Sequence, residues 1–505
     1  MEVDGEARPF LLFSKPNSKK QRSKQEAAAE VQTQPEPPNP SPVTAVEPGL
    51  CDADQAPTAV TERVDSENAG DAAESAPVPS TFAELGLSQW LVDVCHSLGM
   101  RRPTAVQRQC IPRALEGRDV LGIAETGSGK TAAFALPILH RLGEDPYGVA
   151  ALALAPTREL AAQLAEQFRA LGAPLGLRCL AAIGGFDSLG QAKGLARRPH
   201  VVVATPGRIA TLINDDPDLA KVFARTKFLV LDEADRVLDV NFEEDLRVIF
   251  GSLPNKRQTF LFSATISDNL RSLLELSGNN SYFFEAYEGF KTVDTLKQMY
   301  IHVPPDAKEL YLFYLLSKMK EDNIRSVIVF VSTCRTCQYL DFLLEELGHP
   351  AVSLHSHKPQ SRRLAALHNF KSSKVPVLLA TDVASRGLDI QTVDLVINYD
   401  IPRYPRDYIH RVGRTARATR GGLSIGFVTT QRDIRLLHEI EDVVGKQLGA
   451  YDGEMRDVNK NATKVFKARR LANMKMADEG HEDKVHARKE QKKRAQERKR
   501  KHEGL

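Results

Sequence analysis

The sequence has few of the residues that mark secreted or membrane-bound proteins. It contains one tryptophan and only six cysteines among 505 residues. The cysteines stand at positions 51, 95, 110, 179, 334 and 337, which is too scattered for a disulfide framework. No apolar run reaches the ~18 residues that a membrane helix needs, and the acidic start, Met1-Glu2-Val3-Asp4, lacks the order of a secretory signal. We therefore expect a soluble protein of a reducing, intracellular compartment, with no membrane partner.

Charge is spread unevenly along the chain. The whole sequence carries a net charge of +3, but residues 1–80 hold 7 Lys and Arg against 14 Asp and Glu, and residues 456–505 hold 17 against 8. Residues 1–80 also contain eleven prolines and no periodic apolar pattern. Such a segment cannot bury enough apolar surface to offset the entropy of ordering, so we predict a disordered acidic arm. Its basic cluster, Lys19–Lys24, is either a nuclear address or a solvated run of charge.

Short apolar runs alternate with helical patterns between residues 81 and 455. In the first half, the runs that we predict as strands are 120–123, 151–155, 201–204, 228–231 and 259–262. In the second half, they are 299–303, 327–331, 351–354, 375–380, 395–398 and 423–428. Fully apolar strands that alternate with helices predict parallel sheets covered on both faces. We therefore predict two α/β domains, 81–280 and 297–447, joined by a linker at 281–296 and followed by a basic tail at 448–505.

A glycine-rich string with a lysine follows the first predicted strand. It reads Ala124-Glu125-Thr126-Gly127-Ser128-Gly129-Lys130-Thr131 and leads into a predicted helix. In a phosphate-binding loop of this kind, backbone N–H groups and the helix N-terminus hold the phosphates, the lysine adds charge, and the next hydroxyl reaches Mg²⁺. The general pattern begins with glycine where this chain has Ala124. The string predicts a nucleotide site in which Lys130 contacts phosphate and Thr131 contacts the metal.

A pair of acids ends another predicted strand. Residues 228–231 run directly into Asp232-Glu233-Ala234-Asp235. A phosphate-binding loop needs a carboxylate on a second strand to hold the metal, so we predict that Asp232 holds Mg²⁺ through water and that Glu233 polarises the attacking water. An acidic cap for the following helix is the alternative interpretation. The glycine-rich string elsewhere in the chain favours the metal site.

Further strings occur in the order that is typical of DEAD-box ATP-dependent RNA helicases of superfamily 2. In the first predicted domain they are Phe82 with Pro103–Gln107, Pro156–Leu160, Gly184-Gly185, Thr205–Arg208 and Ser263-Ala264-Thr265. In the second they are Val329–Val331, Thr381–Asp389 and His410–Arg417. With the two strings above, they span most of the predicted ordered body, and the chain resembles that family. The resemblance implies two tandem RecA-like parallel-sheet domains.

The resemblance assigns roles to individual residues of the nucleotide site. Phe82, Gln107 and Asp389 would join residues 124–131 in binding ATP, and an amide such as Gln107 can both donate to and accept from the adenine edge. The implied catalytic residues are Lys130, Asp232, Glu233, Arg414 and Arg417. Of these, the two arginines would reach the γ-phosphate from the second domain as planar forks. Met100 stands where the family often has an aromatic residue that stacks on adenine, so stacking is weaker or made differently.

The remaining motifs imply contacts with RNA and a coupling role. The implied RNA-binding residues are Pro156, Thr157, Arg158, Gly185, Thr205, Pro206, Gly207, Arg208, Thr381 and Arg386. Small and backbone-rich residues of this kind suit phosphate and sugar contacts rather than base-edge readout. Ordinary turns for the glycines and a salt bridge for Arg158 are the alternative interpretation. Ser263, Thr265 and His410 would link hydrolysis to strand separation.

A closer resemblance is to the nucleolar helicases of small-subunit pre-rRNA processing. It rests on Trp90–Cys95, Glu144–Gly148 and Arg198–Val202. It implies an RNA-stimulated ATPase of the nucleus and nucleolus that unwinds local RNA duplexes or remodels ribonucleoproteins in small ribosomal subunit biogenesis. The implied cofactors are ATP and Mg²⁺, and the implied partners of the monomer are pre-rRNA and an activating protein. An ATP-gated RNA clamp with slow turnover and a DNA translocase built on the same two domains remain as alternatives.

The end of the basic tail generates a first testable prediction. Residues 484–505 hold ten Lys and Arg against three Asp and Glu and have almost no apolar side chains. Such a segment binds phosphates without reading sequence, and each neutralised phosphate releases counterions. Deletion of 484–505 should leave RNA-stimulated ATPase intact at saturating RNA, weaken the apparent RNA affinity and make its salt dependence shallower. Identical salt slopes for the full chain and the truncated chain, measured on one RNA, would contradict this role.

Overall fold

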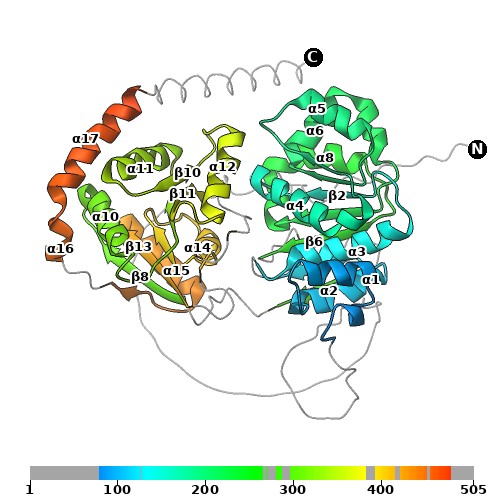
Figure 1. Ribbon diagram of the computed structural model, residues 1–505, viewed down its shortest axis with the longest axis horizontal. Coiled ribbons are helices and arrows are strands. Elements are labelled where there is room, and N and C mark those ends of the chain that lie inside the picture. The colour runs from blue at the N-terminus through cyan, green and yellow to red at the C-terminus, as the bar shows by residue number, and fades with distance from the viewer. Residues whose placement is uncertain are drawn as a thin grey trace, which may run out of the picture. The chain divides into compact units, whose positions relative to one another are not determined.

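Two parallel β-sheets follow one another along the chain in the computed structural model (Figure 1). The structure describes residues 79–124, 127–264, 270, 280–286, 296–382, 390, 393–415, 421–451 and 455–478. All of these residues belong to one compact unit. The predicted fold class, two tandem RecA-like parallel-sheet domains, is confirmed.

The first sheet contains seven described strands in the order β3-β4-β2-β5-β6-β1-β7. They are β1 Val120–Ile123, β2 Ala151–Leu154, β3 Cys179–Ala182, β4 Val201–Ala204, β5 Phe228–Asp232, β6 Gln258–Ser263 and β7 Tyr282–Glu285. Every pair of neighbouring strands is parallel, and the register aligns the first residues of five of them, in sheet order Cys179, Val201, Ala151, Phe228 and Gln258. The carboxyl ends therefore lie along one edge of the sheet and the amino ends along the other.

Helices cover both faces of the first sheet, because successive strand residues point to opposite sides. Ala151 and Ala153 belong to a core with α1 to α4, whereas Leu152 and Leu154 belong to a core with α6 and α8. The helices are α1 Gln89–Ser97, α2 Ala105–Leu115, α3 Lys130–Glu144, α4 Arg158–Leu171, α5 Ser188–Ala196, α6 Pro206–Asp215, α7 Ala234–Val237 and α8 Glu243–Gly251, with 3₁₀ turns η2 Ala83–Leu85, η3 Ala173–Leu175, η4 Pro217–Phe223 and η5 Val240–Phe242.

The second sheet repeats the parallel pattern, with seven described strands in the order β10-β11-β9-β12-β13-β8-β14. They are β8 Leu296–His302, β9 Val327–Val331, β10 Ala351–Leu354, β11 Val377–Thr381, β12 Leu395–Asn398, β13 Gly422–Val428 and β14 Gly449–Ala450. The helices are α10 Lys308–Lys318, α11 Cys334–Leu347, α12 Gln360–Lys371, α14 Pro405–Val412, α15 Gln431–Val444, α16 Met455–Asn459 and α17 Ala462–Asp478, after the 3₁₀ turn η6 Pro305–Ala307. No helix in the described ranges is both long and apolar enough to cross a bilayer.

Three short strands have no counterpart among the predicted runs, and two of them move a predicted boundary. The strand β7 lies inside the predicted linker 281–296 but pairs with β1, so the first sheet extends to Glu285. The strand β14 and the helix α17 lie inside the predicted tail 448–505, although β14 pairs with β8. The third strand, β3, has the sequence Cys-Leu-Ala-Ala, and its first three residues are only half-buried. Residues 1–78, in the predicted arm, and residues 479–505, in the predicted tail, lie outside the described residues.

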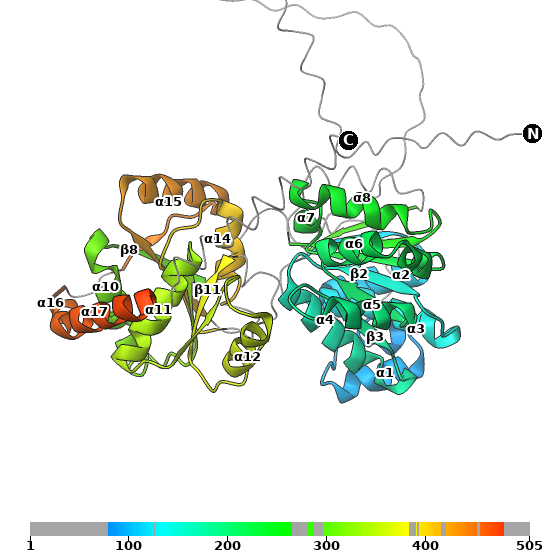
Figure 2. The same cartoon turned by 90° about the horizontal axis from the view of Figure 1, so that it is seen from above.

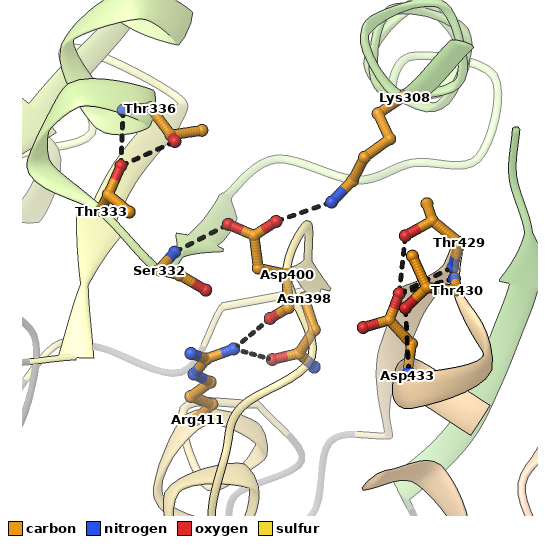
Figure 3. A network of polar contacts seen from close by, with 10 residues as sticks. All are labelled: Lys308, Ser332, Thr333, Thr336, Asn398, Asp400, Arg411, Thr429, Thr430 and Asp433. Atoms are coloured by element: carbon orange, nitrogen blue, oxygen red, sulfur yellow. Dashed lines mark hydrogen bonds and ion pairs between the residues drawn. The ribbon is translucent and has the colours of Figure 1, made fainter. Parts of the chain in front are cut away.

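A buried arginine joins the strand ends of the second domain (Figure 3). Arg411 of α14 donates from Nε and Nη2 to the two carboxylate oxygens of Asp382, at 2.6 and 2.7 Å. Its Nη1 donates to Asn398 Oδ1 at 3.0 Å and to the Asp400 carbonyl at 2.7 Å. The Asp400 carboxylate also accepts from Lys308 Nζ of α10 at 2.6 Å. Removal of one partner from a buried ion pair of this kind typically costs about 3–5 kcal/mol, so α14 is held firmly against β11 and β12.

The helix α17 packs against the second domain although it lies in the predicted basic tail. Its buried residues are Val465, Ala468, Ala472 and Met476, a spacing of three and four that places them on one face. Figures 1 and 2 show α17 beside α11, and Lys475 Nζ lies 2.9 Å from Glu345 and 2.6 Å from Glu346 of that helix. The charged residues between the apolar positions conceal this face in the sequence.

A charge placed on the buried face of α17 should destabilise the second domain alone. Ala472 is fully buried, whereas Ala477 on the same helix is exposed. Ala472→Asp should therefore lower the free energy of unfolding by about 3 kcal/mol, because it buries a carboxylate without a partner, and Ala477→Asp should have little effect. Hydrogen exchange of α11 and α17 measures this opening. The only tryptophan, Trp90, packs beside Gly143 in the first domain, so its fluorescence transition should not move. Equal exchange rates in the two variants would contradict the packing.

Candidate functional site

The glycine-rich loop between β1 and α3 turns on two glycines with left-handed backbone. Gly127 has a φ of 90° and Gly129 a φ of 95°, a region that residues with a side chain rarely adopt. A Cβ on Gly129 would also clash with the side-chain amide of Gln107. These two glycines let the backbone turn from Ala124, at the end of β1, into Lys130, the first residue of α3. The phosphate-binding role of this string stays a prediction.

The Gln107 amide connects this loop to the start of α2. Its Nε2 donates to the Gly129 carbonyl at 3.0 Å, and its Oε1 accepts from the Thr104 N–H at 3.0 Å. The second bond is half of a capping box at the N-terminus of α2. The donor and the acceptor of Gln107 are thus both engaged within the protein. Phe82, which the sequence groups with Gln107, is fully buried in the apolar core with α1 and α2.

Lysine and carboxylate side chains meet where the first strand and the fifth strand end. Lys130 is buried and donates from Nζ to the Ala124 carbonyl at 2.6 Å. Burial lowers the pKa of Lys130, and the carboxylates of Asp232 and Glu233 act against this shift. Burial also raises the pKa of Asp232, while Lys130 lowers it. The charges of the lysine and the acids therefore stabilise one another in a site that removes both from water.

Glu233 is held in an unusual backbone conformation directly after β5. Its φ is 50°, and its N–H donates to Asp232 Oδ1 at 3.1 Å. Burial, followed by the charges of Asp232 and Asp235, raises the pKa of Glu233 to about 7, while Arg414 and Lys130 act in the opposite direction. Its Oε2 atom is buried and has no hydrogen-bond partner among the described residues. A carboxylate oxygen of this kind is available to a ligand or a water molecule.

A cavity of about 390 Å³ opens beside these residues. Its lining includes Met100, Gln107, Thr131, Asp232 and Glu233. The volume lies in the range of small-molecule sites, roughly 300–1,000 Å³. The site that the sequence predicts for a nucleotide therefore has room for one, with the buried charges at its wall.

The predicted RNA motifs of the first domain converge at the carboxyl ends of β2, β3 and β4. Thr157 caps α4 by accepting from the Leu160 N–H at 3.3 Å. The Arg158 guanidinium lies so close to Gly184 and Gly185 that a Cβ on either glycine would come within 3.0 Å of it. The guanidinium can approach this backbone so closely because the two glycines have no side chains.

Arg208 fixes the same group of loops from the next strand. It lies on α6, directly after Thr205, Pro206 and Gly207. Its Nη2 donates to the Phe186 carbonyl at 2.9 Å, and its Nη1 donates to Ser188 Oγ at 2.8 Å. The loop after β4 is thus tied to the loop after β3. Pro156 lies at the half-buried turn between β2 and α4, on the same edge.

The described members of the predicted coupling set and of the second domain's set lie at strand ends, on α14 or shortly after it. Ser263 ends β6, and its carbonyl accepts from the Ala124 N–H at 3.0 Å, which links it to the glycine-rich loop. Thr381 ends β11, and its buried Oγ1 has no partner among the described residues. His410 is buried on α14, and burial lowers its pKa to about 4. Arg414 follows α14 and is almost fully buried.

Several predicted site residues cannot be located. Glu125, Thr126, Thr265, Arg386, Asp389 and Arg417 lie outside the described residues. Their assignments therefore remain predictions from the sequence.

Two features of the site have no place in the predicted set. One is Arg411, which is buried on the same face of α14 as Tyr408. The spacing of three residues between them could have predicted this shared face. The other is a buried cluster around Glu159 of α4, which pairs with Arg363 at 2.9 Å and accepts from Gln360 Nε2 at 2.6 Å. Both partners of Glu159 come from α12 of the second domain. No pattern within either segment indicates this contact, because its members are 201 residues or more apart.

Comparison with known proteins identifies the family. Residues 104–273 match the DEAD/DEAH box helicase family and residues 307–419 match the helicase conserved C-terminal domain. The chain is 92% identical over 504 residues to a rice (Oryza sativa subsp. japonica) protein named DEAD-box ATP-dependent RNA helicase 36, with 100% of both chains covered. It is 50% identical over 399 residues to the human probable ATP-dependent RNA helicase DDX49. The aligned region covers 78% of this chain and 82% of the human one.

The architecture agrees with these sequence matches. The S. cerevisiae protein Dbp5 bound to RNA and ADP BeF3 matches with a TM-score of 0.67 and 30% identity, over 78% of this chain and 100% of that one. The family strings and the two parallel sheets thus agree with these matches. The chain belongs to the DEAD-box family of ATP-dependent RNA helicases.

Proposed function

We propose that this helicase binds ATP and Mg²⁺ at the carboxyl edge of the first sheet and couples hydrolysis to local opening of RNA duplexes or remodelling of ribonucleoproteins. The observation that carries the proposal is the buried cluster of Lys130, Asp232 and Glu233 beside a cavity of about 390 Å³. Three buried ionisable groups at the wall of one cavity are costly for stability, and such groups are typical of catalytic sites.

The residues at the cavity suit the phosphates of a nucleotide. In the proposal, the described loop residues Ala124, Gly127, Ser128 and Gly129 supply backbone N–H groups, and Lys130 exchanges the Ala124 carbonyl for phosphate oxygens. Gln107 would bind the adenine edge after its amide leaves Gly129. From the sequence alone, we add Glu125, Thr126 and, from the second domain, Asp389 to these ATP-binding residues.

The donors near Lys130 also fit a magnesium ion. The Thr131 hydroxyl and the Asp232 carboxylate are hard oxygen ligands, and Mg²⁺ usually takes only one or two protein ligands beside water and phosphate oxygens. Among the described residues, no group of three or more His, Cys, Asp or Glu could hold a metal without such help. Thr131 and Asp232 would hold the ion, which would neutralise charge on the phosphates. Glu233 would orient and polarise the attacking water, and Arg414, with Arg417, would stabilise the negative charge that develops.

RNA would bind where the loops after β2, β3 and β4 meet. Pro156, Thr157, Arg158 and Gly185 from two of these loops, and Thr205–Arg208 from the third, present backbone and guanidinium groups that suit phosphates and sugars. Thr381 and Arg386 would continue the contact in the second domain. Ser263, Thr265 and His410 would couple it to hydrolysis, and the hydrogen bond from Ala124 to Ser263 supports this route.

The cellular role that we propose is pre-rRNA processing for the small ribosomal subunit, in the nucleus and nucleolus. It is supported by the resemblance of Trp90–Cys95, Glu144–Gly148 and Arg198–Val202 to helicases of that process, and by the basic C-terminal residues. The protein would act as a monomer on pre-rRNA with an activating protein. Crosslinking of the chain to cellular RNA, followed by sequencing of the bound sites, should recover pre-rRNA of the small subunit. Recovery of mostly messenger RNA would contradict this role and leave the enzymatic proposal intact.

Glu233→Gln tests the chemistry. The amide keeps the shape of the side chain and loses the basic carboxylate, so we expect ATP binding to persist and hydrolysis to fall by about 10²–10⁴-fold. Single-turnover hydrolysis and nucleotide affinity measure the two effects separately. Glu166→Gln, the same change on the exposed surface of α4, is the control. Normal turnover in Glu233→Gln would reject the assignment, and equal stimulation of the unchanged protein by RNA and DNA would favour a DNA translocase.

A further inference from the structure

A row of cations lies along the amino edge of the first sheet, at the strand ends opposite the candidate site. The loops that lead into β3, β4, β5 and β6 each contribute one or two members. Hereafter called the amino-edge row, it consists of Arg178, Arg197, Arg198, Arg225, Lys227, Lys256 and Arg257. All are exposed except the half-buried Arg257.

The parallel register places these cations side by side. The strands that they precede are neighbours in the sheet together with β2, and their first residues are aligned. Neighbouring strands lie about 4.8 Å apart, so five strands span about 20 Å along this edge. Phosphates follow one another every 3.4 Å along the axis of each strand of a duplex. A backbone of several successive phosphates would therefore match the length of the row.

The loop that leads into β2 contributes an aromatic ring to this edge instead of a cation. Tyr147 lies before β2, with the Arg225 guanidinium 5.3 Å and the Lys227 ammonium 4.9 Å from the centre of its ring. On the other side of the row, Arg178 Nη1 donates to the Arg197 carbonyl at 3.4 Å. Cations that rest on a ring or on a neighbouring loop lose less freedom when they bind an anion than cations on open surface.

The backbone beneath the row is closely packed. A Cβ on Gly148 would clash with the Arg198 carbonyl, so the loops before β2 and β4 touch directly. The Ala150 N–H donates to the His200 carbonyl at 2.9 Å, and the His200 N–H donates to the Arg178 carbonyl at 2.8 Å. These loops contain the strings Glu144–Gly148 and Arg198–Val202, which the catalytic motifs leave without a role.

Few acids offset this positive charge. Residues 144–150, 176–178, 196–200, 224–227 and 254–257 contain the seven cations and only two acids. Of these acids, Glu144 pairs with Arg141 of its own helix at 3.2 Å, and Asp145 lies 3.7 Å from Lys227. A third acid, Asp119, directly precedes β1 and interacts with Arg257. The row therefore has an excess of positive charge that attracts a polyanion.

We propose that the amino-edge row is a second RNA-binding surface, which holds the phosphate backbone of structured RNA without reading its sequence. Five of the seven cations are arginines, whose planar forks bind phosphate with two hydrogen bonds. The proposal rests on the action of this family on RNA and adds a site to the motif residues at the opposite edge. A long RNA would contact both edges, whereas a short strand would occupy the motif residues alone.

Charge reversal of the row tests the proposal in the full chain. The variants are Arg225→Glu, Lys227→Glu and the double variant. The control is Lys193→Glu on the exposed surface of α5, which changes the charge as much as each single variant does. Affinity is measured by fluorescence anisotropy over a range of salt, with a single-stranded RNA of about 10 nucleotides and a hairpin RNA of about 40. The double variant should bind the hairpin about tenfold more weakly, with a salt slope shallower by about two. Its affinity for the short strand and its maximal ATPase rate with that strand should stay unchanged.

The outcomes separate the proposal from its rivals. Hairpin affinity and salt slope equal to those of Lys193→Glu, in variants whose thermal melting is unchanged, would overturn it. If the variants keep their RNA affinity but lose binding to poly-glutamate that the control retains, the row binds an acidic protein segment, and the RNA assignment is wrong. Because anisotropy is measured without hydrolysis, a failure of the proposed ATPase chemistry would appear only in the turnover assay.

Discussion

Parallel pairing of the strands is the constraint on which both edges of the first sheet depend. Because neighbouring strands run in the same direction, every loop that follows a strand reaches one edge, and every loop that precedes a strand reaches the other. Lys130, Asp232 and Arg158 come from three separate strand-to-helix turns and still share an edge. The cations before β3 to β6 share the opposite edge for the same reason. An antiparallel sheet would have divided each of these sets between two edges.

Buried charged groups are satisfied to different degrees in the two domains. In the first domain, Lys130, Asp232 and Glu233 are removed from water without a complete set of partners, since Glu233 Oε2 has no hydrogen bond among the described residues. In the second domain, Arg411 is buried but fully engaged with Asp382, Asn398 and the Asp400 carbonyl. A buried polar network in which every group has a hydrogen-bond partner stabilises one structure. A network with an unpaired group can still bind a ligand through that group.

Much of this arrangement can be predicted from the sequence where the signal is local. The runs at 120–123 and 228–231 form strands. Because these strands are parallel, the acids after one strand and the lysine that begins the helix after the other lie at the same edge of the sheet. The packed face of α17 escapes prediction because Val465, Ala468 and Ala472 stand among lysines and arginines. Two of the three are alanines, whose small side chains give a weak apolar signal. The strand β3 escapes prediction because its run of four residues is short and mostly half-buried. The contact of Glu159 with Arg363 depends on how two helices of different domains pack, and no local pattern contains that information.

If Gln107 binds the base as proposed, its two hydrogen bonds have a consequence for nucleobase preference. Any base that takes up this amide must replace the Gly129 carbonyl as acceptor and the Thr104 N–H as donor. The affinity for the base is therefore a difference between two sets of hydrogen bonds, and only part of either set appears as binding free energy. Occupancy of the base position and the conformation of the glycine-rich loop are then thermodynamically linked, and the linkage is reciprocal. A substitution at Thr104 that never touches the base would change base selectivity, because it changes the state from which the amide is released.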